Sequence, residues 1–554
     1  MKFSSATVVP FLTPLLLLAT ATVACAEDPQ AASATVAPQF GWLNWAVLIA
    51  YLGAMVGIGG YFSRGESSSE DFFLAGGRIP WWAAGLSIYG TQLSAITFMA
   101  VPAIAFTPDG NWTKIVGGWT TLLLAPLVIR FYLPLFRRLK VQTAYEYLER
   151  RFHVAVRLIA SLIFIAFQVG RMGIVLLLPA AAISATTGCN LLAAVILMGV
   201  LATTYTVLGG IEAVIWTDVV QVIVLIGGAL LCLIVSLLEI GGPVQLFDIA
   251  AESNKLTMFH WSTDPGQPST WVLVVGFFFI NLIAYTTDQT VVQRYLTTRD
   301  ESAAARSIWL NGLMTIPTGV LFLLLGTALW GFYQTHPDAT APAQVDQAVP
   351  WFVMHQLPAG IAGLVIAAIF AAAMSSLDSS MNSIASAVVN DFWLRLRGPA
   401  KPETEIRVAR GLTLLIGVLG TSMALTMAVS QITSLFDYFN LMLGMLGGGL
   451  SGLFLLAIFT TRGHWIGALV GLAAGAAATA VVQLDSTLHV YLAGAAGTLT
   501  CFLVGYLVSR LVPSPQRDLT GLTIYTLTPL DAQNALEQEH SQPSPTPSFD
   551  SSVG

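Results

Sequence analysis

The chain of 554 residues is 55% hydrophobic and only 10% charged, a composition that excludes a soluble globular protein and predicts a polytopic membrane protein. Its net charge of -6 adds little, and its four cysteines have no paired spacing, so neither a disulfide framework nor a cysteine-ligated metal site is indicated. The sequence has no P-loop, GxSxG or HExxH motif, which argues against an ATP-driven pump and the common hydrolases.

The N-terminus has the pattern of a secretory signal peptide. Lys2 precedes an apolar run from Val8 to Ala24, and Ala24-Cys25-Ala26 resembles a cleavage site. The sequence therefore predicts a signal peptide over residues 1–26 and an external segment over residues 27–42. An uncleaved additional helix is the alternative.

Thirteen apolar segments follow, each long enough to cross a bilayer, and together they predict a transmembrane domain over residues 43–510. Their bounds are roughly 43–63, 81–106, 115–135, 155–185, 190–208, 212–238, 271–292, 307–334, 356–388, 406–428, 434–460, 464–483 and 489–510. Residues 511–554 are more polar and end in a Pro- and Ser-rich run, which predicts a disordered tail.

The basic residues predict the orientation. With the mature N-terminus outside, an odd number of spans places the C-terminus and the tail in the cytoplasm. Only Lys114 and Lys255 then fall outside, in agreement with the positive-inside rule. The basic residues on the inner side are Arg137, Arg138, Lys140, Arg150, Arg151, Arg157, Arg294, Arg299, Arg306, Arg395, Arg397, Lys401, Arg407, Arg410 and Arg462.

Two of the predicted spans are interrupted by small and polar residues. The second contains Tyr89-Gly-Thr-Gln-Leu-Ser-Ala95, and the seventh contains Asn281 and then Tyr285-Thr-Thr-Asp-Gln289. These spans open two successive groups of five, and broken helices at matching positions of two halves indicate the midplane binding site of a transporter. The alternative is that Gly90 is a packing contact and the polar residues solvate a helix end.

The ninth predicted span carries a polar face. At helical spacing Ser375, Asp378, Ser379 and Asn382 lie on one side, behind three alanines that permit close helix approach. Such a face is costly in hydrocarbon, so it must point into the bundle, where hard oxygen ligands suit a small hard cation. The alternative is that the hydroxyls bond to their own helix and that the small residues serve packing.

Several motifs in a fixed order resemble the sodium:solute symporter family, and bacterial sodium/sialic acid symporters in particular. They are Glu70–Arg78, Pro80–Gly85, Ser94–Met99, Thr143–Glu149, Gly170-Arg171, Gly209–Gln221, Val292–Tyr295 and the stretch around Ser375. The resemblance implies an all-α membrane protein with the LeuT-type fold, two inverted five-helix repeats and alternating access around a central site.

The resemblance also implies sodium ligands. One sodium site would use the backbone carbonyls of Gly90, Leu93 and Ala372 and the hydroxyls of Ser375 and Ser376. A second site, found in part of the family, would use Asp218, Ser375 and Ser379, with Asp378 in a position where the sialic acid relatives carry serine. Asp218 could instead be a structural partner near the start of its helix.

The implied substrate site is less complete. Ser94, Thr97 and Arg171 match positions that hold the sugar acid in the sialic acid relatives, although Arg171 could instead tie helices together through backbone carbonyls. Asn281 matches a sugar contact in the sodium/sugar branch. The departures are Gln92 in place of a threonine, Gly118 in place of a glutamine and Lys114 in place of an aromatic residue.

These observations predict a sodium-coupled symporter in a bacterial cytoplasmic membrane, and not an enzyme. The expected partners are one or two sodium ions, a small and possibly anionic organic solute, and membrane lipid, with no nucleic acid and no obligate protein partner. Sialic acid is the first candidate solute, and a neutral sugar or another carboxylate is the alternative. A solute sensor that uses a transporter fold is an alternative of another class.

Overall fold

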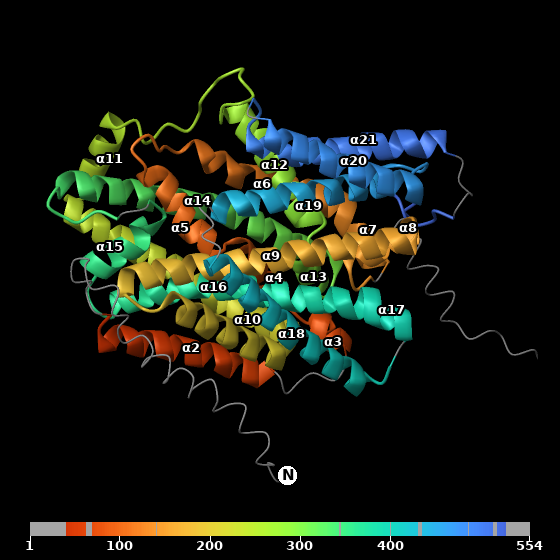
Figure 1. Ribbon diagram of the computed structural model, residues 1–554, viewed down its shortest axis with the longest axis horizontal. Helices are drawn as coiled ribbons and strands as arrows, with labels where there is room; N and C mark the ends of the chain where they lie inside the picture. The colour runs from red at the N-terminus through yellow and green to blue at the C-terminus, as the bar shows by residue number, and fades with distance from the viewer. Residues whose placement is uncertain are drawn as a thin grey trace, which may run out of the picture.

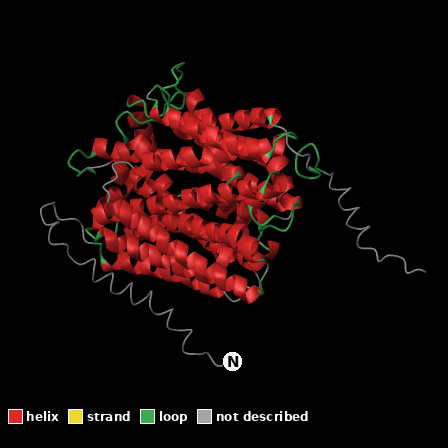
Figure 2. Cartoon of the chain, turned by 45° about the vertical axis from the view of Figure 1, so that its right-hand side comes forward, coloured by secondary structure: helices red, strands yellow, loops and turns green. Residues whose placement is uncertain are grey.

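The fold is a bundle of long helices, and most of the helix axes are roughly aligned with one another (Figures 1 and 2). The structure is a computed structural model that describes residues 40–62, 69–139, 141–342, 345–398, 400–429, 435–485, 487–512 and 518–527. Within these ranges the only strand-like pairing is one isolated bridge between Ile79 and Thr298. The predicted signal peptide over 1–26 lies outside the described residues.

The helices of the first half of the chain are α2 (Trp42–Phe62), α3 (Ser69–Leu74), η2 (Ala75–Gly77), α4 (Trp81–Gln92), α5 (Ala95–Phe106), η3 (Thr113–Ile115), α6 (Val116–Leu127), η4 (Val128–Tyr132), α7 (Leu133–Arg138), α8 (Ala144–Arg151), α9 (Val154–Thr187), α10 (Leu191–Ile240) and α11 (Pro243–Glu252). Those of the second half are α12 (Thr270–Thr286), α13 (Gln289–Leu296), α14 (Glu301–Thr335), η5 (Val345–Gln347), α15 (Ala348–Gln356), α16 (Ile361–Ala387), η6 (Val388–Trp393), α17 (Leu394–Arg397), α18 (Pro402–Val429), α19 (Leu435–Phe459), α20 (Trp465–Leu484), η7 (Val490–Leu492) and α21 (Ala493–Leu511).

The predicted spans all coincide with helices, but the structure does not confirm the predicted number of thirteen. In the described chain, nine helices are long and apolar enough to cross a membrane, or up to eleven if each of two bent pairs is one span. The count of thirteen would also require α19 to be a span and the 50-residue α10 to form two. A straight helix of that length would measure about 75 Å, well over twice the thickness of a bilayer core. Gly210 interrupts α10 with φ of 51° and ψ of -154°, between the two predicted spans.

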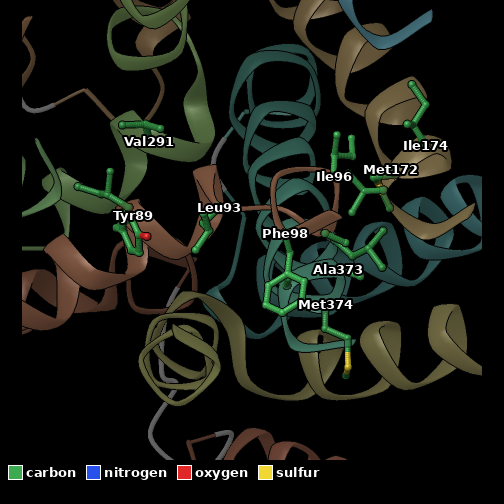
Figure 3. Close-up of a cluster of buried hydrophobic side chains, with 14 of the residues drawn as sticks. Tyr89, Leu93, Ile96, Phe98, Met172, Ile174, Val291, Ala373 and Met374 are labelled. Atoms are coloured by element: carbon green, nitrogen blue, oxygen red, sulfur yellow. The ribbon is translucent and has the colours of Figure 1, made fainter. Parts of the chain in front are cut away.

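Both predicted helix breaks are confirmed. Helices α4 and α5 meet at 62°, and α12 and α13 meet at 54°. Between α4 and α5, Leu93 and Ser94 leave the helical conformation with ψ values of 82° and 169°. At the second break the side chain of Asp288 accepts a hydrogen bond from the backbone N–H of Thr290, which caps the start of α13. Apolar neighbours such as Phe98 anchor the first break in the core (Figure 3).

Helix α16 forms the centre of the bundle. It packs against α9 and α10, which flank it in Figure 1, and also against α2. Every residue from Val365 to Ala387 is buried, so the predicted polar face of this helix points into protein, as the cost of exposing it to lipid requires.

The chain beyond α21 is packed in one stretch where the sequence predicts disorder over 511–554. Within the described residues 518–527, the backbone carbonyl of Leu522 accepts a hydrogen bond from the hydroxyl of Tyr147 at 2.8 Å. The backbone N–H of Ile524 donates to the carbonyl of Ile458 at 3.3 Å, and Thr523 is buried. A short local turn with two apolar residues therefore docks against α8 and α19, although the composition around it is polar.

Close packing of α14 against α5 yields a prediction. A Cβ added at Gly326 would lie 2.0 Å from the backbone carbonyl oxygen of Pro102, whereas a Cβ at Gly319 of the same helix would meet no atom within 4 Å. We expect Gly326→Ala to lower the free energy of unfolding by about 1–3 kcal/mol through overpacking. Gly319→Ala should be neutral or stabilising, because alanine favours the helix. Thermal unfolding of the two purified variants measures this, and equal melting temperatures would contradict the close contact.

Candidate functional site

A cavity of about 380 Å³ lies beside both helix breaks. Its walls come mainly from α5, α6, α9, α12 and α14, and they are largely apolar. The six residues predicted to contact the solute, Gln92, Ser94, Thr97, Gly118, Arg171 and Asn281, all line it. The fold therefore brings these six residues together, and their contact with a solute stays a prediction.

Two polar atoms at the cavity have no hydrogen-bond partner among the described atoms. They are the side-chain nitrogen Nε2 of Gln92 and the hydroxyl of Tyr89, both buried. A buried polar group that makes no hydrogen bond costs about 1–3 kcal/mol, so both atoms favour a ligand with hydroxyl or carbonyl oxygens. Asn281 is already engaged, because its Nδ2 donates to the hydroxyl of Thr120 at 2.9 Å.

Arg171 on α9 ties helices together, which was the alternative to a solute contact, and it also lines the cavity. Its Nη2 donates to the backbone carbonyl of Thr91 at the first break, at 2.9 Å, and its Nη1 lies 3.7 Å from a carboxylate oxygen of Asp288 at the second. Asp288 is held in turn by Gln168, whose Nε2 donates to it at 3.0 Å. A guanidinium has five N–H donors, so these contacts leave it able to bind a solute as well.

The residues predicted for the first sodium site converge where α4 ends against α16. A Cβ added at Gly90 would lie 3.5 Å from the hydroxyl oxygen of Ser375 and 2.8 Å from Val222, so glycine allows this close approach. The hydroxyl of Ser376 donates to the carbonyl of Thr91 at 3.3 Å. Carbonyls in the last turn of a helix lack intrahelical partners, which is the property that an ion site at the end of α4 requires.

The other predicted ligands of this site are placed by the same two elements. Leu93 lies at the break itself, and Ala372 precedes Ser376 by one turn of α16. The alternative to ion binding was that the serine hydroxyls bond to their own helix. Two other serines of α16 do so, because the hydroxyls of Ser379 and Ser380 donate to backbone carbonyls one turn earlier, at 2.5 and 2.8 Å.

A buried ion pair lies next to this region. Nη2 of Arg294, on α13, lies 3.0 Å from a carboxylate oxygen of Asp218, on α10, and both side chains are fully buried. Nε of Arg294 donates to the hydroxyl of Ser87 at 2.7 Å, and Ser87 donates to the same carboxylate at 2.5 Å. Arg294 also donates to the hydroxyl of Ser379, and Ser375 donates to the other oxygen of Asp218.

Asp378 lies beside the ion pair and is also fully buried. Its carboxylate accepts a hydrogen bond from the hydroxyl of Tyr205 at 2.7 Å. The hydroxyl oxygen of Ser379 lies 3.3 Å from the other carboxylate oxygen, but its proton is donated to the carbonyl of Ser375. Asp218, Asp378 and Arg294 together carry a formal charge of -1. In the part of the chain that the structure describes, no group of three or more His, Cys, Asp or Glu residues could hold a metal ion. Hydroxyl, carbonyl and carboxylate oxygens at this place suit a hard monovalent cation rather than a transition metal.

Sequence reasoning missed Arg294, which it counted among the basic residues on the inner side. The structure buries it in the core, and Arg157 and Arg151 of the same group are also buried. Two features of the sequence could have identified Arg294. It follows the second helix break by only a few residues, and an arginine in a bundle that contains an intramembrane aspartate has an obvious partner.

Residues 72–475 match the model of the sodium:solute symporter family. The chain belongs to this family. The symporter is 40% identical over 482 residues to the sodium/sialic acid symporter of Aliivibrio fischeri, covering 86% of this chain and 94% of that one. It is 39% identical to the sodium/sialic acid symporter of Proteus mirabilis, covering 87% and 97%.

A solved structure agrees with this assignment. The substrate-bound, outward-open structure of a Na⁺-coupled sialic acid symporter matches the symporter with a TM-score of 0.81 at 37% identity, over 86% of this chain and all of that one. The predicted all-helical fold and the prediction of a transporter rather than an enzyme are thereby confirmed. The protein is a multi-pass, sodium-coupled membrane symporter.

The ion pair yields a second prediction. Arg294→Met would leave the carboxylate of Asp218 buried without its cation, which typically costs about 3–5 kcal/mol of stability. The matched control is Arg299→Met, five residues along the chain, where the side chain is 90% exposed.

We expect a large fall in the melting temperature of purified Arg294→Met and almost none in the control. The double variant Arg294→Met, Asp218→Asn should recover part of the loss, because it removes the unpaired charge. If the single variant and the control unfold at the same temperature, the pair does not support the fold.

Proposed function

We propose that the protein imports sialic acid or a related sugar acid together with sodium, by alternating access across a bacterial cytoplasmic membrane. The observation that carries the proposal is the position of the cavity. One wall is formed by the α4–α5 break, whose other side faces Ser375 and Ser376 of α16. A solute and an ion bound there would share the same short piece of backbone.

The chemistry of the cavity supports an oxygen-rich acid as the solute. Arg171 offers N–H donors to a carboxylate, and Gln92, Tyr89, Ser94 and Thr97 offer hydrogen bonds to hydroxyl or amide groups. The apolar walls suit the carbon face of a sugar ring. The alternatives are another carboxylate and a neutral sugar, and the negative charge of Asp288 next to Arg171 favours the neutral sugar.

We propose one sodium ion at the carbonyls of Gly90, Leu93 and Ala372 and the hydroxyls of Ser375 and Ser376. A second sodium ion is supported by the charge of -1 that Asp218, Asp378 and Arg294 share, because one monovalent cation would neutralise it. It would bind between Asp218, Asp378, Ser375 and Ser379. A ratio of one sodium ion per solute, found equally in the wild type and in Asp378→Asn, would contradict the second site.

The organisation of the chain completes the proposal. A signal peptide over 1–26 is removed, an external segment over 27–42 precedes the membrane domain over 43–510, and the C-terminal tail over 511–554 faces the cytoplasm. Support comes from the distribution of basic residues, since Lys114 and Lys255 lie at the ends of helices that the orientation places outside.

Uptake into proteoliposomes tests the function. Labelled sialic acid, a neutral hexosamine and a short monocarboxylate are compared with an imposed inward sodium gradient and with potassium in its place. The proposal expects concentrative uptake of sialic acid that requires sodium. Uptake of the neutral sugar alone would move the assignment to the alternative.

The ion site yields a third prediction. In Ser375→Ala, Ser376→Ala, two hydroxyl ligands are lost from a dry site, so the ion is under-coordinated and the sodium concentration for half-maximal uptake should rise at least several-fold. Ser386→Ala, in a later turn of the same buried helix, is the matched control and should behave like the wild type. Sodium activation curves of uptake, recorded on folded protein, measure this concentration. The same half-maximal sodium concentration in the double variant as in the wild type would show that these serines do not bind the ion.

Charge selection yields a fourth prediction. If Arg171 binds the carboxylate of the solute, Arg171→Gln should lower the affinity for acidic solutes by about 1.5–3 kcal/mol, the range for a hydrogen bond to a charged group. Neutral analogues should lose much less. Competition of each analogue against labelled solute measures both losses, and equal losses would show that Arg171 acts through its contacts with Thr91 and Asp288.

A further inference from the structure

The two carboxylate oxygens of Asp378 have different surroundings. Oδ2 accepts the proton of the Tyr205 hydroxyl at 2.7 Å, and the carbonyl oxygen of Met374, at 3.4 Å, is a more distant acceptor for the same proton. Oδ1 lies 3.3 Å from the hydroxyl oxygen of Ser379, whose proton goes to the carbonyl of Ser375. No described side chain therefore donates a proton to Oδ1, and its lone pairs are available to a cation.

The carboxylate of Asp218 is bound at both oxygens. One oxygen accepts hydrogen bonds from Arg294 and Ser87, and the other accepts one from Ser375. Of the four carboxylate oxygens at the proposed second ion site, Oδ1 of Asp378 is thus the one that receives no proton from a described side chain. Its position decides how well this carboxylate can bind an ion.

Ser379 connects this oxygen to the buried ion pair. The hydroxyl of Ser379 accepts a hydrogen bond from Nη2 of Arg294, and the same Nη2 lies 3.0 Å from a carboxylate oxygen of Asp218. Oδ1 of Asp378 therefore faces a hydroxyl that borders the pair. A monovalent cation bound at Oδ1 would lie where the two carboxylates and the guanidinium leave a charge of -1.

Tyr205, which holds the other oxygen, has little freedom to move. It is fully buried and lies in the part of α10 that precedes the break at Gly210. A Cβ added at Gly59 of α2 would lie 2.8 Å from Cβ of Tyr205 and 3.0 Å from its carbonyl oxygen, so glycine lets α2 pack directly on this residue (Figure 1). A tyrosine side chain has only two rotatable bonds, and its hydroxyl is thus a donor in a fixed place.

We propose that Tyr205 is a positioning residue for the second sodium ion. Its hydroxyl holds Oδ2 of Asp378, and this fixes the carboxylate with Oδ1 turned toward Ser379 and the ion. The inference rests on the proposed function, because it assumes that a second sodium ion binds between Asp218 and Asp378.

The expected effect follows from the freedom of the carboxylate. Without the hydroxyl of Tyr205 the side chain of Asp378 can rotate, and an ion must then also fix that rotation when it binds. Removal of a hydrogen-bond partner of a metal ligand typically lowers metal affinity by roughly 10- to 100-fold. A monovalent ion attracts a carboxylate less strongly than a divalent ion does, so we expect the lower end of that range.

Equilibrium binding of labelled sodium to purified protein tests this. In the wild type we expect two sodium ions per protein. Tyr205→Phe removes one hydroxyl and keeps the ring, and it should raise the dissociation constant of one ion roughly tenfold while that of the other changes much less. A merely structural role would weaken both ions together or lower the folded fraction, which the melting temperature reports.

A second variant shows whether the effect passes through the carboxylate. In Asp378→Ala there is no carboxylate to orient, so adding Tyr205→Phe should leave the sodium binding of that variant unchanged. Asp378→Ser provides the same comparison if Asp378→Ala does not fold. The matched control is Tyr147→Phe on α8, where a fully buried tyrosine loses a hydrogen bond of 2.8 Å to the carbonyl of Leu522. It should bind sodium like the wild type.

The outcomes separate the two claims. If the wild type binds two ions, the same dissociation constants in Tyr205→Phe, an equal weakening of both ions, or an effect that persists in Asp378→Ala would overturn the positioning role and leave the second ion site standing. A single sodium ion in the wild type would overturn the second ion site, and this inference with it.

Discussion

The fully buried pair of Arg294 and Asp218 is the interaction on which the geometry of the centre depends. Neither charge can remain in a dry bundle without the other, so the helices that carry them must stay in register. Arg294 follows the second helix break, and it also donates to Ser87 on α4 and Ser379 on α16. One guanidinium thus joins α13, α10, α4 and α16, the elements that surround the proposed ion sites. Two broken helices, which lack continuous backbone hydrogen bonding, gain a fixed support from it.

The carbonyl of Thr91 connects the proposed solute and ion sites. It accepts one hydrogen bond from Arg171, which lines the cavity, and another from Ser376, a proposed sodium ligand on the opposite side. An ion that draws the hydroxyl of Ser376 toward itself weakens the hydrogen bond from Ser376 to this carbonyl, and so changes the strength of the hydrogen bond from Arg171. In the same way, a carboxylate bound to Arg171 changes the hydrogen bond from Ser376. Coupling between the two sites then needs only one peptide group, and by linkage it must act equally in both directions.

The sequence predicted the helix breaks and the buried polar face because each follows from a local rule. Gly90, Ser94 and Asp288 interrupt apolar runs, and a carboxylate at Asp378 cannot face lipid. It did not predict the partners of Arg294, nor the contact between Arg171 and Asp288, because such pairs join segments that are more than seventy residues apart in one case and more than a hundred in the other.

The sequence also did not determine the number of membrane spans, for a related reason. Gly210 leaves the helical conformation in the middle of α10. Whether the two parts of this helix cross the membrane separately depends on their position in the bilayer, which hydropathy alone does not give.

The central claim concerns the coupling between the solute and ion sites, and equilibrium binding tests it most directly. The dissociation constant of sialic acid is measured by calorimetry on purified protein in sodium and in potassium at equal ionic strength. We expect tighter binding of sialic acid in sodium than in potassium, and sodium affinity raised by the same factor when sialic acid is present. Equal dissociation constants in the two salts would contradict coupling between the sites.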